Sequence, residues 1–202
     1  MLFNNKTRLV KYLTSILIGM PIWFVVGILI TFSPEFGRAM GFDQPIDAGK
    51  AVLFAFAGQV AGNIISGSLS QYLQSRKKVI LLFMVLSFSF VLMYLLIPLR
   101  DATWFYALAA CLGFCSGYWT LFITVAAELF GSNLRATVAT TVPNFVRATV
   151  IPLTFLFLFL KNKVGVMYSA LIVGSFSYLV AILALVYLEE TFKKDINYTE
   201  DS

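Results

Sequence analysis

The stretch TTVPNFVRATVIP, residues 140–152, places one charge, Arg147, near the middle of an apolar segment that covers residues 136–160. A helix needs about 20 mostly apolar residues to cross the hydrocarbon core of a bilayer, so this segment is long enough to span a membrane. Arg147 would lie about 11 residues into the span, or about 17 Å along the helix axis. A charge at that depth costs about 2.5–3.5 kcal/mol or more, so we expect it to have a partner or a function.

The composition of the whole chain agrees with a membrane environment. Hydrophobic residues make up 59% and charged residues 12% of the 202 residues, against roughly 45–50% and about 25% in soluble domains. There is no histidine, the apolar segments hold no paired carboxylates, and Cys111 and Cys115 have no neighbouring base. The sequence therefore predicts no catalytic residues, no metal site and no cofactor, and an intramembrane enzyme is disfavoured.

Six apolar segments are long enough to span the bilayer, and they are too long for the strands of a barrel. The sequence predicts an all-α membrane protein with a six-helix bundle over residues 9–188. Its predicted spans are residues 9–32, 48–73, 79–98, 103–127, 136–160 and 166–188. Residues 1–8 and 189–202 are predicted to be a short leading segment and a charged tail, and residues 33–47 a loop rich in turn residues. The first apolar run is too long for a signal peptide, so we expect it to be retained.

The basic residues predict the orientation of the bundle. Nine lie on one side, namely Lys6, Arg8, Lys11, Arg76, Lys77, Lys78, Arg135, Lys193 and Lys194, and five on the other, namely Arg38, Lys50, Arg100, Lys161 and Lys163. Basic loops are retained on the cytoplasmic side, so both termini are predicted to be cytoplasmic in a multi-pass protein of the cell membrane. The net charge of +5 comes from these scattered loop residues rather than from a basic face, so no nucleic-acid partner is expected.

The second span carries two stripes at helical spacing. Its small residues, Ala51, Ala55, Gly58 and Gly62, would let another helix approach closely. Its polar residues, Gln59, Asn63, Ser66 and Ser70, should face protein or water. Two roles remain open for the polar stripe, which could contact a solute or form hydrogen bonds between helices. Gln59 and Asn63 are the candidates for a solute cavity.

The fourth span combines two glycines with a tryptophan. Gly113 and Gly117 are four residues apart, a spacing that favours close helix packing. Trp119 lies at the centre of the span, whereas membrane tryptophans usually lie at the interface. It could stack on a ring of a solute, although core packing is the commoner role of a large aromatic residue.

The fifth span presents a polar face around Arg147. Its members are Thr137, Thr140, Thr141, Asn144 and Arg147, and the helix also contains Pro143 and Pro152. Proline interrupts the backbone hydrogen bonds, so we expect a kinked helix that lines a cavity, with Thr140, Asn144 and Arg147 as candidate solute contacts. No other predicted span has a carboxylate at the depth of Arg147. Its partner is predicted to be a solute anion, a carboxylate of another bundle, or a carbonyl, hydroxyl or water; a purely structural arginine is the alternative.

Three short motifs, taken together, resemble the major facilitator superfamily of secondary transporters. In GSLSQYLQSRKKV, residues 67–79, Gly67, Arg76 and Lys77 match the loop signature between the second and third helices of each half, but Gln71, Gln74 and Ser75 depart from it. In AELFGSNLRAT, residues 127–137, Glu128 and Arg135 match a motif of sugar-porter-like and related members, with Gly131 in place of a proline. PNFVR, residues 143–147, is similar to a motif in the fifth helix of the second half.

The resemblance implies the C-terminal half of a twelve-helix transporter that moves a small organic solute by alternating access. It implies a loop network of Gly67, Arg76, Lys77, Glu128 and Arg135, in which Glu128 pairs with Arg135, while Gln71 argues against a charge-pair latch within the first motif. A half bundle has half a cavity, so the implied partner is a second six-helix half or another copy of the chain, and the chain could be a fragment, the product of a split gene or a self-pairing half. The alternative is a membrane scaffold or degenerate half that binds partner helices without transport.

Overall fold

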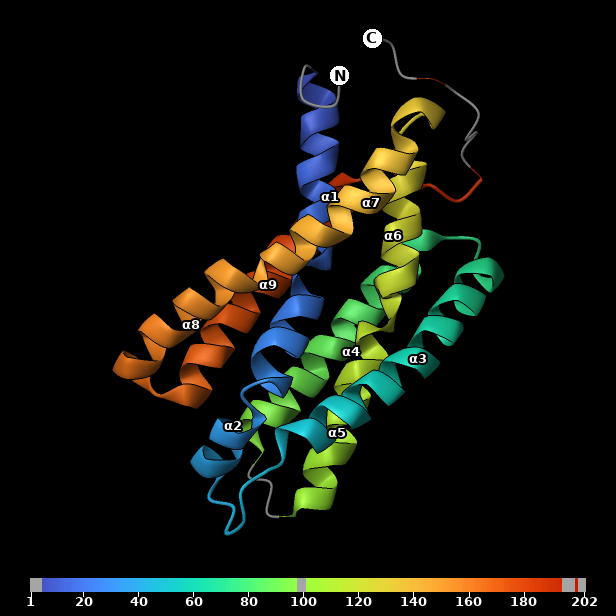
Figure 1. Cartoon of the computed structure of the whole chain (residues 1–202). Coiled ribbons are helices and arrows are strands. Elements are labelled where there is room, and N and C mark those ends of the chain that lie inside the picture. Colours follow the sequence, from blue (N-terminus) through green and yellow to red (C-terminus); the bar gives the residue numbers. More distant parts are fainter. Residues whose placement is uncertain (1–4, 98–100, 194–198, 200–202) are drawn as a thin grey trace.

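The computed structural model describes residues 5–97, 101–193 and 199, and among these every regular element is a helix. Six helical segments are long and apolar enough to cross a membrane, which confirms the predicted all-α bundle. In chain order they are α1 (Lys6–Phe24) with a π-helical turn η1 (Val25–Ile30); α3 (Ala48–Tyr72); α4 (Arg76–Leu96); α5 (Ala102–Cys115), the 3-10 turn η2 (Ser116–Tyr118) and α6 (Trp119–Glu128); α7 (Ser132–Ala148) and α8 (Val150–Val164); and α9 (Val166–Tyr187). In Figure 1, α1 and α7 begin at the upper end of the bundle, and α2 lies at the lower end.

Several predicted elements fall partly outside the described residues. They are the first four residues of the leading segment, Pro98 at the end of the predicted third span, Arg100, and most of the charged tail including Lys194.

Side-chain caps fix where the helices begin. Asn5, Asp47, Ser75 and Asp101 each precede a helix and accept hydrogen bonds from backbone N–H groups of its first turn. Such caps satisfy donors that the helix itself cannot pair. Because Asn5 and Ser75 act as caps, the first and third spanning helices begin about one turn earlier than hydropathy alone predicted, at Lys6 and Arg76.

The prediction of a loop over residues 33–47 is wrong for the first half of this range, where the helix α2 (Ser33–Met40) forms. Pro34 lies in the first turn of α2, where proline is favourable, and Gly41 ends the helix in the left-handed region with φ 83°. Phe36 on α2 is fully buried, and its ring lies 5.5 Å from that of Tyr94. Packing of this one aromatic residue explains why residues typical of turns form a helix here.

Close packing of α3 against α5 confirms the predicted small-residue stripes. A Cβ atom added to Gly58 or Gly62 would lie 2.0 Å from the carbonyl oxygen of Ala110 or Phe114. In return, a Cβ on Gly113 would lie 1.8 Å from the carbonyl oxygen of Ala55. The two backbones therefore touch directly, as membrane helices do where small residues face each other.

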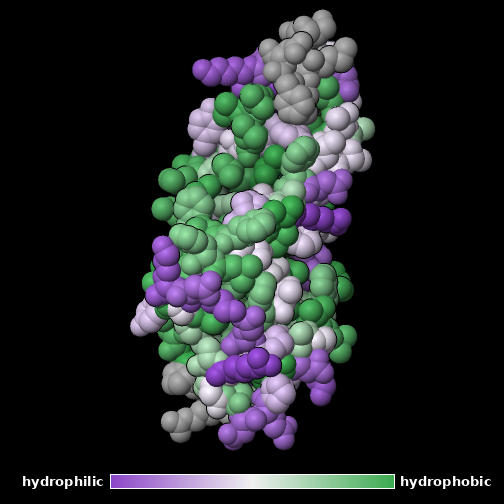
Figure 2. All heavy atoms as spheres, turned by 60° about the vertical axis from the view of Figure 1, so that its left-hand side comes forward, coloured by the Kyte–Doolittle hydropathy of each residue, from purple (hydrophilic) through white to green (hydrophobic). Residues whose placement is uncertain are grey.

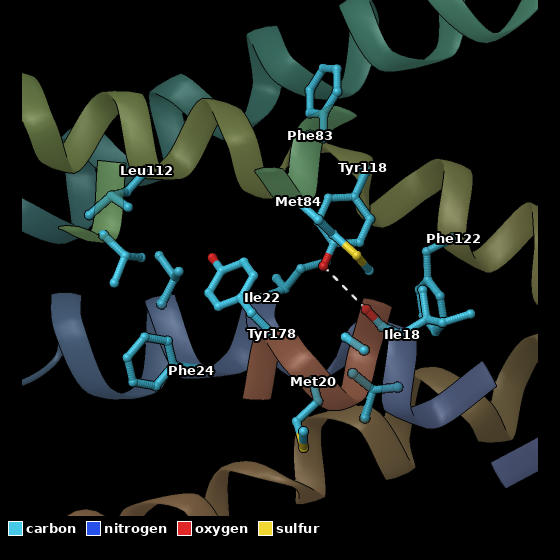
Figure 3. Close-up of a cluster of buried hydrophobic side chains, with 14 of the residues drawn as sticks. Ile18, Met20, Ile22, Phe24, Phe83, Met84, Leu112, Tyr118, Phe122 and Tyr178 are labelled. Atoms are coloured by element: carbon cyan, nitrogen blue, oxygen red, sulfur yellow. Dashed lines mark hydrogen bonds between the residues drawn. The ribbon is translucent and has the colours of Figure 1, made fainter. Parts of the chain in front are cut away.

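The core of the bundle surrounds α1. Ile18, Phe24, Tyr118 and Phe122 are among its fully or almost fully buried side chains, and the hydroxyl of Tyr118 donates to the carbonyl of Ile18 at 3.2 Å (Figure 3). The outer surface is also largely apolar. Figure 2 shows hydrophobic side chains over much of the middle of one face, with hydrophilic ones mostly in the lower part and near the top. An apolar surface of this kind suits contact with lipid.

Candidate functional site

A cavity of about 210 Å³ lies between four of the spanning helices, far from their ends. Its lining residues are Ile22 and Trp23 of α1, Val26 of η1, Phe56, Gln59 and Asn63 of α3, Trp119 of α6 and Arg147 of α7. We call it the mid-span cavity. It is lined mostly by apolar and aromatic side chains with a few polar groups, which is the usual character of small-molecule sites.

The guanidinium of Arg147 lies over two indole rings in this cavity. Its central carbon is 5.9 Å from the ring centroid of Trp23 and 5.9 Å from that of Trp119. The two rings meet edge to face, with centroids 6.3 Å apart. Both contacts are within the range in which an aromatic face attracts a cation. The sequence did not predict these aromatic contacts, which α1 and α6 supply. The predicted partner outside this chain, or in a carbonyl, hydroxyl or water, stays a prediction.

The indoles stabilise the charge of Arg147 but leave its N–H groups available. A guanidinium has five N–H donors. The face of an indole attracts the charge but does not accept hydrogen bonds from these donors in the way that a carboxylate does. Within the described part of the chain, no hydrogen bond or ion pair to the Arg147 side chain is found. The site therefore holds a positioned cation whose hydrogen-bonding capacity is unused.

An interruption of the fifth spanning helix follows directly after Arg147. Helix α7 ends at Ala148, α8 begins at Val150, and the hydroxyl of Thr149 donates to the carbonyl of Val146 at 2.6 Å. Pro152 has no N–H for the carbonyl of Ala148, which accounts for a break at this position. Pro143, in contrast, lies within an unbroken part of α7.

The polar stripe of α3 divides between the two roles left open by the sequence. Asn63 Oδ1 accepts from the Thr120 hydroxyl at 3.2 Å, and Ser66 donates to the Gly117 carbonyl at 2.7 Å, so both residues join α3 to the η2–α6 segment. Gln59 lines the cavity, and its amide has no hydrogen-bond partner among the residues that the structure describes. Gln59 is therefore the stripe member best placed to contact a ligand.

The structure brings together four of the six residues predicted for a solute cavity, namely Gln59, Asn63, Trp119 and Arg147. Thr140 and Asn144 are exposed on α7 and do not line the cavity. Asn144 donates to the backbone carbonyl of Thr140 at 2.9 Å, so its amide is used within the helix. Trp23 also lines the cavity but was not selected from the sequence, although a tryptophan inside a span is the signal that selected Trp119.

A second set of polar contacts lies at the upper end, where α4 begins and α6 ends. Arg76 Nη2 lies 3.1 Å from Glu128 Oε1, and Arg76 Nη1 donates to the Ser70 hydroxyl at 2.9 Å. The two charged side chains are only 14% and 17% exposed, so water screens the pair little. The sequence predicted Glu128 to pair with Arg135. In the structure Arg76 holds Glu128, and Arg135 donates to the carbonyl of Phe130 at 3.4 Å.

Glu190, just after α9, holds the start of α4. Its carboxylate accepts from the Ser75 hydroxyl and from the backbone N–H groups of Arg76 and Lys77, at 2.9 and 3.2 Å for the last two. Burial raises the pKa of Glu190, but these hydrogen bonds and one from the Phe192 N–H outweigh it, so the pKa lies below its ordinary value. Lys77 in turn donates to the carbonyls of Val186 and Leu188. We call these contacts, with the Arg76–Glu128 pair, the upper-end network.

Gly67 borders an open cavity beside this network. The cavity has a volume of about 570 Å³, and its lining also includes Ser68, Gln71, Arg76 and Thr124. A Cβ atom on Gly67 would meet nothing within 4 Å, so the glycine keeps this surface open rather than permitting a close helix contact.

These features define a multi-pass membrane protein with a polar and aromatic cavity at mid-span. The family model described as Major Facilitator Superfamily matches residues 1–148 of the 202 residues, from the start of the chain to the end of α7. The chain therefore belongs to the Major Facilitator Superfamily, whose members are transporters. No curated protein matches the chain at a significant level. The match names the superfamily and no subtype, so the likeness to sugar porters stays a prediction.

Proposed function

We propose that the chain acts as the C-terminal six-helix half of a secondary transporter for a small organic solute that carries an anionic group. Membership of the transporter superfamily supports the general function. The observation that carries the solute class is the position of Arg147, a cation at mid-span that rests on two indoles and keeps its N–H donors available.

The chemistry of the cavity favours a carboxylate as the ligand group. A carboxylate can accept two parallel hydrogen bonds from a guanidinium, and such charge-assisted bonds are about twice as strong as neutral ones. The low dielectric at mid-span strengthens the attraction further. The Gln59 amide can bond a second polar atom of the solute, and the ring of Trp119 can pack against its apolar part. The part of the cavity that this half supplies has a volume of about 210 Å³, which suits a small molecule.

A second six-helix half is proposed to cover the open side of the cavity. Only 17% of the most apolar window of α3 is buried within the bundle, and 28% of that of the α7–α8 segment. Polar side chains such as Gln71, Thr140 and Asn144 lie exposed on these same helices. Polar groups facing hydrocarbon are costly, so these helices are better suited to contact with protein. The solute would then lie between two halves that rock against each other. The upper end would face the cytoplasm, because most of the basic residues lie there.

Uptake measurements test this function. Cells that produce the protein should accumulate radiolabelled small carboxylates above vector-only cells, and Arg147→Gln should lower that uptake about tenfold or more, because a charge-assisted bond contributes about 1.5–3 kcal/mol. Arg38→Gln is the matched control, since Arg38 is an exposed arginine of α2 outside the cavity. Equal uptake by wild type and Arg147→Gln contradicts the role of Arg147. No uptake by wild type of any anionic or neutral solute contradicts transport by paired copies of this chain, and leaves a separate second half or a scaffold as the alternatives.

A further inference from the structure

A groove of about 230 Å³ lies at the upper end, on the outside of the bundle between the start of α4 and the end of α9. Its lining residues are Lys77, Lys78, Leu81, Leu185 and Val186, none of which borders the mid-span cavity. Leu81 and Val186 are 38% and 66% exposed, so the groove opens to the surface of the bundle. The groove therefore has two basic side chains, Lys77 and Lys78, beside an apolar surface formed by Leu81, Leu185 and Val186.

Lys77 is held in place at the rim of this groove. Its ammonium donates to the carbonyl of Val186 at 3.1 Å and to that of Leu188. Carbonyls at the end of a helix have no N–H partner within the helix, so Lys77 supplies one. An ammonium has three N–H donors, so one remains for a ligand. Lys78 is exposed beside it. The Glu190 carboxylate accepts from the Ser75 hydroxyl and from N–H groups of the first turn of α4, so it serves as the cap of this helix.

The groove lies at the depth where both apolar spans end. Arg76–Leu96 begins, and Val166–Tyr187 ends, within a turn or two of the groove-lining residues. Lipid headgroups lie at this level, with their acyl chains directed along the apolar surface below. Basic pockets between spanning helices at this level bind the headgroups of anionic lipids.

We propose that this groove binds an anionic glycerophospholipid. The phosphate lies between the Lys77 and Lys78 ammonium groups, and the first part of an acyl chain lies against Leu81, Leu185 and Val186. Charge complementarity selects an anionic over a zwitterionic headgroup, and the apolar surface selects a lipid over a soluble phosphate compound. This site is independent of the proposed solute cavity.

Native mass spectrometry of the purified protein in detergent tests the proposal. With equal amounts of phosphatidylglycerol and phosphatidylcholine added, wild type should retain phosphatidylglycerol preferentially. Lys78→Gln should lower that preference about fivefold, the contribution typical of one basic residue at an anionic lipid surface. Lys163→Gln, an exposed lysine at the far end of α8, should leave it unchanged. Lys77 is not substituted in this experiment, because its side chain also binds the end of α9.

Three results would overturn the proposal. The first is an equal preference for phosphatidylglycerol in wild type and Lys78→Gln. The second is equal retention of the two lipids by wild type. The third is displacement of phosphatidylglycerol by inorganic phosphate, which would indicate a site for soluble phosphate groups. An unchanged melting temperature of Lys78→Gln shows that the variant is folded, so each of these results bears on binding alone.

Discussion

Arg76 and Arg147 differ both in exposure and in partner, because Arg76 is only 14% exposed whereas Arg147 is exposed on the open side of its cavity. Arg76, at the upper end, bonds to the Glu128 carboxylate and the Ser70 hydroxyl. Arg147, at mid-span, lies over the faces of Trp23 and Trp119. The first arginine uses its donors within the protein and so joins α4 to α3 and α6. The second has its charge stabilised and its donors spare, which is the arrangement expected of a binding group.

The comparison predicts the largest loss of stability for a change at the upper-end network. Glu128→Gln should lower stability by about 1–3 kcal/mol, because it leaves a shielded guanidinium without its carboxylate. Thermal unfolding of the purified protein in detergent measures this loss. Adding Arg76→Gln to Glu128→Gln should restore part of it, since the unpaired charge is then removed. Glu128→Gln should leave solute affinity unchanged; a large loss of affinity would mean that the two arginines do not have separate roles.

A smaller effect is expected from uncoupling Arg147 and its aromatic partners. Trp119→Leu and Arg147→Gln, made singly and together, should show a coupling of about 0.5–1 kcal/mol, the range for an exposed cation over an aromatic ring. Thermal unfolding of the four proteins in the cycle measures it. Trp104→Leu is the matched control, because Trp104 is 68% exposed on α5 and should show no coupling to Arg147. Additive effects of Trp119→Leu and Arg147→Gln would contradict the cation–π contact.

The smallest effect concerns the pH dependence of the upper end. The pKa of Glu190 is lowered in the folded protein, so its contribution to stability is present above the ordinary glutamate pKa of about 4.3. That contribution is lost as pH falls through the lower folded value, when the carboxylate that accepts from Ser75 and the α4 N–H groups becomes protonated. Melting temperatures of wild type and Glu190→Gln should therefore differ at neutral pH and converge in strong acid. A constant difference at all pH values would contradict this account.

The bilayer explains why so much of the fold could be predicted from the sequence. Its thickness fixes the length of each span, and the need to pair backbone groups makes each span a helix. Helical periodicity then placed Gln59 and Asn63 on one face of α3. The short helix α2 was missed because Pro34, Gly37 and Gly41 are also typical of turns. The burial of Phe36, which favours the helix, depends on tertiary contacts that the sequence does not show.

The contacts within the candidate site were harder to predict, because they join helices that are distant in sequence. Periodicity shows which side of its own helix Arg147 occupies, but it does not show that α1 and α6 bring two indoles to the same depth. In the same way, the motif around Glu128 indicated a charged partner, and the tertiary structure supplied Arg76 from α4.

The most direct test of the central claim is tryptophan fluorescence of the Trp104→Phe variant, in which only the two indoles of the mid-span cavity remain among the three tryptophans. The purified protein is titrated with carboxylates from acetate to benzoate and with the matching neutral amides. If a solute carboxylate binds Arg147, the carboxylates should change the fluorescence with saturation, the amides should not, and Arg147→Gln should abolish the response. An equal response to carboxylates and amides, or a response that persists in Arg147→Gln, would contradict the assignment of Arg147 as the anion-binding group.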